Sequence, residues 1–268
     1  MEGTAAVCSW QQCDPNNLTE YPYYRHLMSL EVRAAIEGAR QAGATDVLVN
    51  DSHSSMRNVL WNELPQDVRM IYGNRKPFSM AQGLTSDFAA AFFTGYHAPA
   101  GEPNATLEHS YTPSTIYNVR VNGTRCSEAT LNAALAGTCG VPVILITGDQ
   151  ATVDFAQSQM PWITGVVVKE SIGKFAVNSM SPEEARAAIR QGAQRAMSRL
   201  QEARPFTFTA PVTLEIDFVL SEQADFAELI PGFERRGGRS VRFVHEDYAS
   251  IFRAFVAAFR LGSAANQP

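Results

Sequence analysis

The sequence predicts an α/β protein, mainly a βα-alternating sheet domain followed by a smaller C-terminal α+β part. Up to residue 204, short apolar runs alternate with stretches of helical periodicity. After Arg204-Pro205 the pattern changes to strands of alternating polarity and one final helix. The 268 residues, 45% of them hydrophobic, are enough for a substantial core. We therefore expect an α/β domain over residues 1–204, examined below for a metal-binding catalytic site, and a small α+β appendage over residues 205–268.

The first half of the chain predicts one helix and several strands. Over residues 24–42, Leu27, Leu30 and Ala34 recur at helical spacing, and Gly43 is a suitable terminator. The apolar runs that predict strands are residues 46–50, 68–72, 89–96 and 114–121. The last strand leads into Asn122-Gly123, which is a strong hairpin signal.

In the second half, residues 127–135 predict a helix, residues 141–147 a buried strand, Asp149 a helix start, and residues 162–169 a strand. Ser181, Pro182 and Glu184 combine an N-cap, a first-turn proline and a capping box, so a helix should run to about residue 203. The appendage predicts strands at 212–218 and 240–244 and a helix at 247–261. Five phenylalanines there suit either its own core or subunit contacts: Phe206, Phe208, Phe218, Phe226 and Phe233.

Composition excludes several classes of protein. The 22 basic and 27 acidic side chains give a net charge of −5, which argues against a nucleic-acid binder. No apolar run approaches the roughly 20 residues that cross a bilayer, and the first residues do not resemble a signal peptide. The four cysteines form no CxxC pair, so we expect free thiols in a reducing cytoplasm, with disulfides as the less favoured alternative.

Two histidines follow predicted strands directly. His53 comes after the strand at 46–50, and His97 comes after the strand at 89–96. In α/β sheets ligands gather beyond the carboxyl ends of strands, so these two imidazoles could meet at one metal or acid–base site. The simpler interpretations are a turn residue for His53 and a core-edge histidine for His97.

Two further residues extend this candidate site. His109 lies in a polar loop, which by itself favours a surface residue, and Glu128 begins a helix, where the dipole favours an acidic residue in any case. Imidazole and carboxylate ligands suit zinc, with manganese or cobalt as alternatives. The chain contains no HExxH, P-loop, GxGxxG or GxSxG motif. Spacing alone therefore indicates a metal site without defining its chemistry.

A set of short motifs occurs in a fixed order over nearly the whole chain. They are Met1-Glu2-Gly3, residues 47–54 (VLVNDSHS), residues 76–80 (KPFSM), Gly95-Tyr96-His97-Ala98, His109-Ser110, Glu128 with Leu131-Asn132-Ala133, Val141-Pro142-Val143 and Gly148-Asp149. Together they resemble the zinc-dependent D-aminopeptidases of the DppA type, a family named for a dipeptide-transport operon product. Each motif alone is weak, but the ordered set is specific.

The resemblance implies a two-zinc aminopeptidase that removes N-terminal D-amino acids from short peptides. It also implies a ring-shaped homo-oligomer, a decamer of stacked pentamers with active sites facing an inner chamber. The positions that match the family's zinc ligands are Glu2, His53, His97 and Glu128. His109 matches the catalytic nucleophile or base, and we favour the base because direct attack would require an acyl-imidazole intermediate. In such a site, zinc polarises the scissile carbonyl and lowers the pKa of bound water.

The chain departs from the family pattern at its start. The family motif is a strand ending in Asp-Met-Glu-Gly, whereas this sequence begins at the Met, without the aspartate that bridges the two metals. We expect a longer native protein. The alternatives are a short form that holds fewer than two zincs, or a non-catalytic ring-forming relative. A metallohydrolase acting on another small amide is a further alternative, because the D-preference rests entirely on the resemblance.

Overall fold

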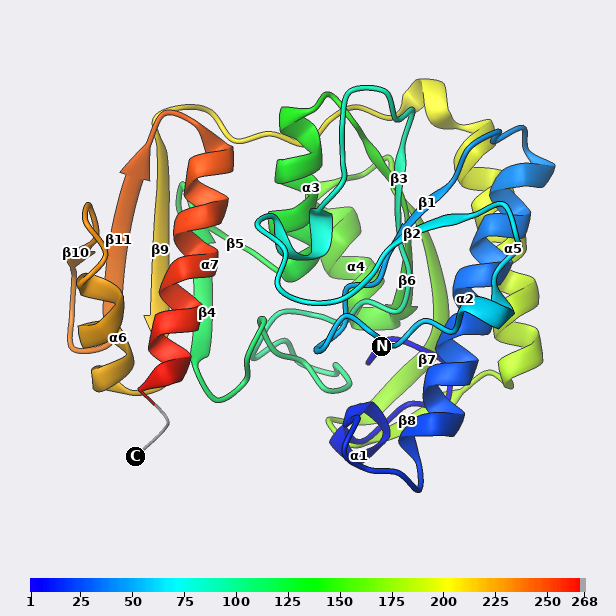
Figure 1. The fold of residues 1–268 in the computed structure, drawn as a ribbon, viewed down its shortest axis with the longest axis horizontal. Coiled ribbons are helices and arrows are strands. Elements are labelled where there is room, and N and C mark those ends of the chain that lie inside the picture. Colours follow the sequence, from blue (N-terminus) through cyan, green and yellow to red (C-terminus); the bar gives the residue numbers. More distant parts are fainter. Residues whose placement is uncertain (266–268) are drawn as a thin grey trace.

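The computed structural model describes residues 1–265. Figure 1 shows an α/β part with the chain's N end near it, and beside this an antiparallel sheet with its own helices. The described strands form three separate sheets. The expected α/β class is thus confirmed, with the antiparallel sheet as a distinct layer.

The larger sheet of the α/β part has the order β3-β6-β7-β8. Its strands are β3 (Ala91–Phe93), β6 (Val143–Asp149), β7 (Thr164–Gly173) and β8 (Ala176–Ser179). The first three are parallel and β8 is antiparallel to β7. Every residue of β6 is buried, because helices cover both faces of this central strand. This burial explains why the sequence there is a continuous apolar run.

Two pairs of helices cover this sheet. α2 (Tyr21–Gln41) and α5 (Pro182–Ser198) pack on one face, and α3 (Glu128–Thr138) and α4 (Gln150–Gln159) pack on the other. α2 and α5 lie side by side in Figure 1, and a Cβ at Gly38 would come within 2.3 Å of the Arg190 carbonyl oxygen. Glycine therefore permits this close approach. The predicted capping box at Ser181 and Glu184 is present.

The remaining parallel strands are β1 (Leu48–Asn50) and β2 (Arg69–Ile71), which pair only with each other. β1 and β3 are not hydrogen-bonded to one another. Both strands instead line a cavity of about 1280 Å³, to which Val49 and Phe92 contribute. We call this space the central cavity, and it extends to the carboxyl ends of β1 and β3.

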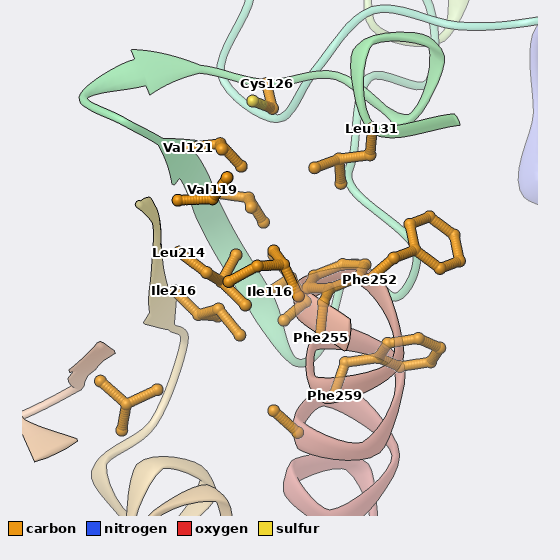
Figure 2. Close-up of a cluster of buried hydrophobic side chains, with 14 of the residues drawn as sticks. Ile116, Val119, Val121, Cys126, Leu131, Leu214, Ile216, Phe252, Phe255 and Phe259 are labelled. Carbon is orange, nitrogen blue, oxygen red and sulfur yellow. The ribbon is translucent and has the colours of Figure 1, made fainter. Parts of the chain in front are cut away.

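The antiparallel sheet has the order β10-β11-β9-β4-β5. Its strands are β4 (Ile116–Val121), β5 (Thr124–Arg125), β9 (Val212–Phe218), β10 (Glu234–Arg235) and β11 (Ser240–His245), and its helices are α6 (Ser221–Glu228) and α7 (Tyr248–Ala264). Figure 2 shows phenylalanines of α7 facing the apolar side chains of β4 and β9, with Leu131 of α3 beside them. The predicted Asn122-Gly123 hairpin joins β4 to β5. Residues 116–125 thus share a sheet with residues 212–245, while the division at 204/205 stays a prediction.

Several short elements were not predicted from sequence. They are α1 (Trp10–Cys13), β8, α6, β10 and three 3₁₀ turns at Trp61–Glu63, Ser79–Ala81 and Leu200–Glu202.

Of the five phenylalanines, Phe218 and Phe233 are buried, Phe206 and Phe208 pack partly buried against the same core, and only Phe226 is exposed. Most of them therefore serve the core. All four cysteines are free, and no helix within residues 1–265 is both long and apolar enough to span a bilayer.

Candidate metal and catalytic site

Five side chains singled out in the sequence line the central cavity: Glu2, His53, His97, His109 and Glu128. They come from the N-terminal turn, the loop after β1, the loop after β3, the long loop before β4 and the first residue of α3. His109, which its polar neighbours would place at the surface, is only 7% exposed. Strand ends and a helix start thus bring together residues that are far apart in the chain.

Glu2 and His53 form the first half of the site. The Glu2 Oε1 atom lies 3.0 Å from His53 Nε2, and both side chains are largely buried. Gly3 permits this position, because its N–H donates to the Gly95 carbonyl at 3.1 Å and a Cβ would collide with the Tyr96 carbonyl oxygen. Cys13, at the end of α1, is the third member of this group. We call Glu2, Cys13 and His53 the N-terminal cluster.

The loop that carries His53 is held by Asp51 and Asn58. The buried Asp51 carboxylate accepts hydrogen bonds from the backbone N–H groups of Asn58, at 2.5 Å, and Val59, at 2.7 Å. The Asn58 Oδ1 atom lies 3.4 Å from His53 Nδ1 and also accepts from the Tyr21 hydroxyl at 2.6 Å. An Nδ1–H that faces this oxygen leaves the Nε2 lone pair directed at Glu2, as a metal ligand requires.

His97, His109 and Glu128 form the second half, which we call the helix-start cluster. Glu128 Oε1 lies 3.3 Å from His97 Nε2 and 3.8 Å from His109 Nε2. The two imidazoles stack with centroids 3.8 Å apart and planes inclined by 13°. Their Nδ1 atoms lie 3.0 and 2.8 Å from the carbonyl oxygens of Ala98 and Leu107. With Nδ1–H donating to these carbonyls, both Nε2 atoms face the Glu128 carboxylate.

Burial and charge separate the pKa values of these groups. Burial opposes protonation of His97, but the Glu128 carboxylate outweighs it and raises the His97 pKa to about 9. Burial and the neighbouring His97 together lower the His109 pKa to about 4. For Glu128 and Glu2, burial acts to raise the pKa. His97 outweighs it at Glu128, and His53 with the N-terminal ammonium 3.1 Å away outweighs it at Glu2, so both pKa values fall below their ordinary value. In this balance His109 is neutral at neutral pH and both carboxyl groups are ionised.

The two clusters fit a transition metal. In each, three donor atoms lie within 4.8 Å of one another, and the donors are imidazole nitrogen, carboxylate oxygen and one thiol sulfur. These are the ligand types that zinc takes in proteins. An α/β protein with such groups around an accessible cavity has the features of a metallohydrolase.

The chain belongs to the M55 peptidase family of D-aminopeptidases, whose family model matches residues 1–257. A D-aminopeptidase of Bacillus subtilis (strain 168) is 34% identical over 245 residues, which is 90% of this chain and 88% of that protein. The solved structure of the Zn-dependent D-aminopeptidase DppA from Bacillus subtilis, described as a self-compartmentalizing protease, superposes with a TM-score of 0.95. The two chains are 31% identical, and the match covers 98% of this chain and 95% of the DppA chain.

Sequence reasoning missed three contributors to the site: Cys13, Asn58 and Trp10. The Trp10 ring contacts the His109 imidazole edge-on, with centroids 5.2 Å apart. No spacing rule connects residues 10 and 13 to residues 53 and 109, since their proximity is created by the tertiary fold. The only local signal is the occurrence of Trp10 and Cys13 a few residues after the Met1-Glu2-Gly3 motif.

Proposed function

We propose that this chain is a zinc-dependent aminopeptidase that releases D-amino acids from the amino end of short peptides in the central cavity. The proposal assigns Glu2, His53, His97 and Glu128 as zinc ligands and His109 as the catalytic base. The observation that carries it is the convergence of these five side chains on one cavity. Retention of these five residues favours an active enzyme over a non-catalytic relative.

Each cluster would hold one zinc ion, so we propose two sites per chain. Zinc supplies Lewis acidity that polarises a peptide carbonyl and makes water nucleophilic near neutral pH. Glu2 and His53 would hold one ion, and His97 and Glu128 the other. The Glu128 Oε1 atom also accepts a hydrogen bond from the Tyr111 N–H at 2.5 Å, which fixes the carboxylate at the start of α3.

His109 is suited to moving protons. Its Nδ1 faces the Leu107 carbonyl at 2.8 Å, and the Trp10 ring edge and the stacked His97 confine the imidazole plane. Burial lowers the His109 pKa below its ordinary value, so the imidazole is neutral and its Nε2 lone pair is available at neutral pH. His109 would accept the proton of the attacking water and deliver it to the departing amine.

The relative of known structure is a self-compartmentalizing protease, and we propose that this chain likewise self-associates, as a ring-shaped decamer with the cavity open to an inner chamber. The substrates would then be peptides short enough to enter the chamber. The preference for D-residues is proposed from the family description. A panel of D- and L-aminoacyl amides and dipeptides separates this function from a metallohydrolase of another small amide.

Replacement of His109 by alanine tests the catalytic assignment. We expect kcat for a D-alanyl dipeptide to fall by about 10²- to 10⁴-fold, because the base is lost, while the zinc content stays unchanged. The matched control is His26→Ala, since His26 is half-exposed on α2 and pairs with Glu63 away from the site. Unchanged hydrolysis in His109→Ala, or loss of zinc from it, would contradict the role of base.

A further inference from the structure

We propose that the Cys13 thiolate is a metal ligand in the N-terminal cluster, where it completes a Glu2–His53–Cys13 site for zinc or a similarly thiophilic divalent cation. This proposal depends on the proposed function in one respect: the metal held by the N-terminal cluster is taken to be the zinc that the aminopeptidase uses. Cys13 lies outside the motifs that carry the family resemblance.

The position of the sulfur carries the proposal. Cys13 is the last residue of α1 and is only 5% exposed. Its Sγ, a Glu2 carboxylate oxygen and a His53 ring nitrogen all lie within 4.8 Å of one another. Donor atoms around a tetrahedral zinc ion are about 3 to 4 Å apart, so small side-chain rotations bring this group to ligating distance.

Hydrophobic packing explains only part of the environment of Cys13. Cys13 belongs to an apolar cluster with Val7, Tyr21 and Met28, where a small hydrophobic side chain is suitable. A packing role gives no reason for the same sulfur to approach a carboxylate and an imidazole that lie 3.0 Å apart. Cys13 is also a free thiol, so its sulfur is not committed to a disulfide.

The donor set determines which ion is favoured. A thiolate, an imidazole and a carboxylate favour zinc or cobalt, whereas magnesium and calcium prefer oxygen ligands alone. On binding, the S–H bond is broken, the sulfur–metal bond forms and the proton is released to solvent. The fourth position of a tetrahedral ion remains for water or substrate, as in catalytic zinc sites.

Cobalt substitution of the full chain tests the proposal without a hydrolysis assay. The apo chain is loaded with Co²⁺ and its near-ultraviolet spectrum is recorded, because a cobalt–thiolate bond gives a sulfur-to-metal charge-transfer band. We expect this band in the wild-type chain and its loss in Cys13→Ser. We expect bound zinc to fall toward one ion per chain in Cys13→Ser. The zinc affinity of the N-terminal cluster should fall by at least roughly 10- to 100-fold, which is the loss typical of changing a residue that only supports a metal ligand.

A second variant keeps the test decisive if Cys13→Ser does not fold. Cys8, Cys126 and Cys139 are free thiols outside both clusters, so a Cys8→Ser/Cys126→Ala/Cys139→Ser chain leaves Cys13 as its only thiol. The band must persist in this chain. Bound cobalt without the band in wild type or in this variant, or a band that survives in Cys13→Ser, overturns the proposal. Hydrolysis is measured separately. A charge-transfer band without hydrolysis would reject the aminopeptidase function and retain Cys13 as a ligand. Hydrolysis without the band would reject Cys13 as a ligand and retain the aminopeptidase function.

Discussion

At the scale of single residues, Glu128 gives two stacked imidazoles different protonation states. His97 Nε2 is the nearer to its carboxylate, at 3.3 Å, and the His97 pKa is raised to about 9. The charge on His97 then adds to burial in lowering the His109 pKa to about 4. Pairs of titratable groups whose environments separate their pKa values are common at catalytic sites. Two chemically identical side chains therefore differ in charge at neutral pH.

Glu31 of α2 gives a pH-dependent prediction away from both clusters. Its Oε1 accepts a hydrogen bond from the Ala5 N–H at 2.8 Å, and burial raises the Glu31 pKa from 4.5 to about 7. Between these values the folded state holds a proton that the unfolded state has released, so the free energy of unfolding falls as pH rises through this window. The full loss is on the order of 3 kcal/mol.

The variant Glu31→Gln removes this titration. We expect its free energy of unfolding to lose most of the decline seen in wild type between about pH 5 and about pH 8. Urea unfolding of both chains across this range measures the effect. An equal decline in the two chains would show that Glu31 is not the group responsible.

At the scale of elements, the N-terminal segment is held in place by Lys169 of β7. This ammonium, 1% exposed, donates to the backbone carbonyl of Glu2, to that of Thr4 at 2.9 Å and to that of Val7 at 2.6 Å. One lysine therefore satisfies three buried acceptors of an irregular segment. Its effect on the site is to fix the backbone from which the Glu2 carboxylate projects.

Replacement of Lys169 by methionine keeps the length of the side chain and removes its donors. Each carbonyl left without a partner costs about 1–3 kcal/mol, so we expect a lower midpoint of thermal unfolding. Zinc affinity should fall roughly 10- to 100-fold as Glu2 shifts. Competition with a chromophoric chelator measures the affinity, and Arg33→Met, at a partly exposed ion pair on α2, is the control. Unchanged zinc affinity in Lys169→Met would contradict the positioning role.

Elements with a local signal could be predicted from the sequence, and those without one could not. The Ser181 capping box and the Asn122-Gly123 hairpin depend on residues within a few positions of each other, and both form as expected. β8 has no continuous apolar run, and its residues alternate between exposed and half-buried because it lies at the sheet edge. Its formation depends on pairing with β7, which short-range patterns do not reveal.

The candidate site follows the same division. His53 and His97 could be located because each follows its strand closely in sequence. The placement of His109 came from the family resemblance, since its loop composition indicated a surface residue. Cys13 approaches His53 only through the packing of α1 against the N-terminal segment, so no feature of the sequence near either residue pointed to the contact.

At the scale of the whole molecule, the central cavity connects the fold to its chemistry. The facing edges of β1 and β3 line it, and the two clusters lie at the carboxyl ends of these strands. The cavity measures about 1280 Å³, which exceeds the usual range of small-ligand pockets. Next to the antiparallel sheet, Phe259 and Arg260 of α7 line part of the wall.

The most direct test of the account is a zinc titration of the chelator-treated chain, with hydrolysis of a D-alanyl dipeptide and its L-alanyl counterpart measured at each step. We predict no hydrolysis without metal, and activity on the D-substrate that rises with bound zinc and is much greater than on the L-substrate. Zinc bound in both clusters without hydrolysis of either dipeptide would contradict the assignment as a D-aminopeptidase.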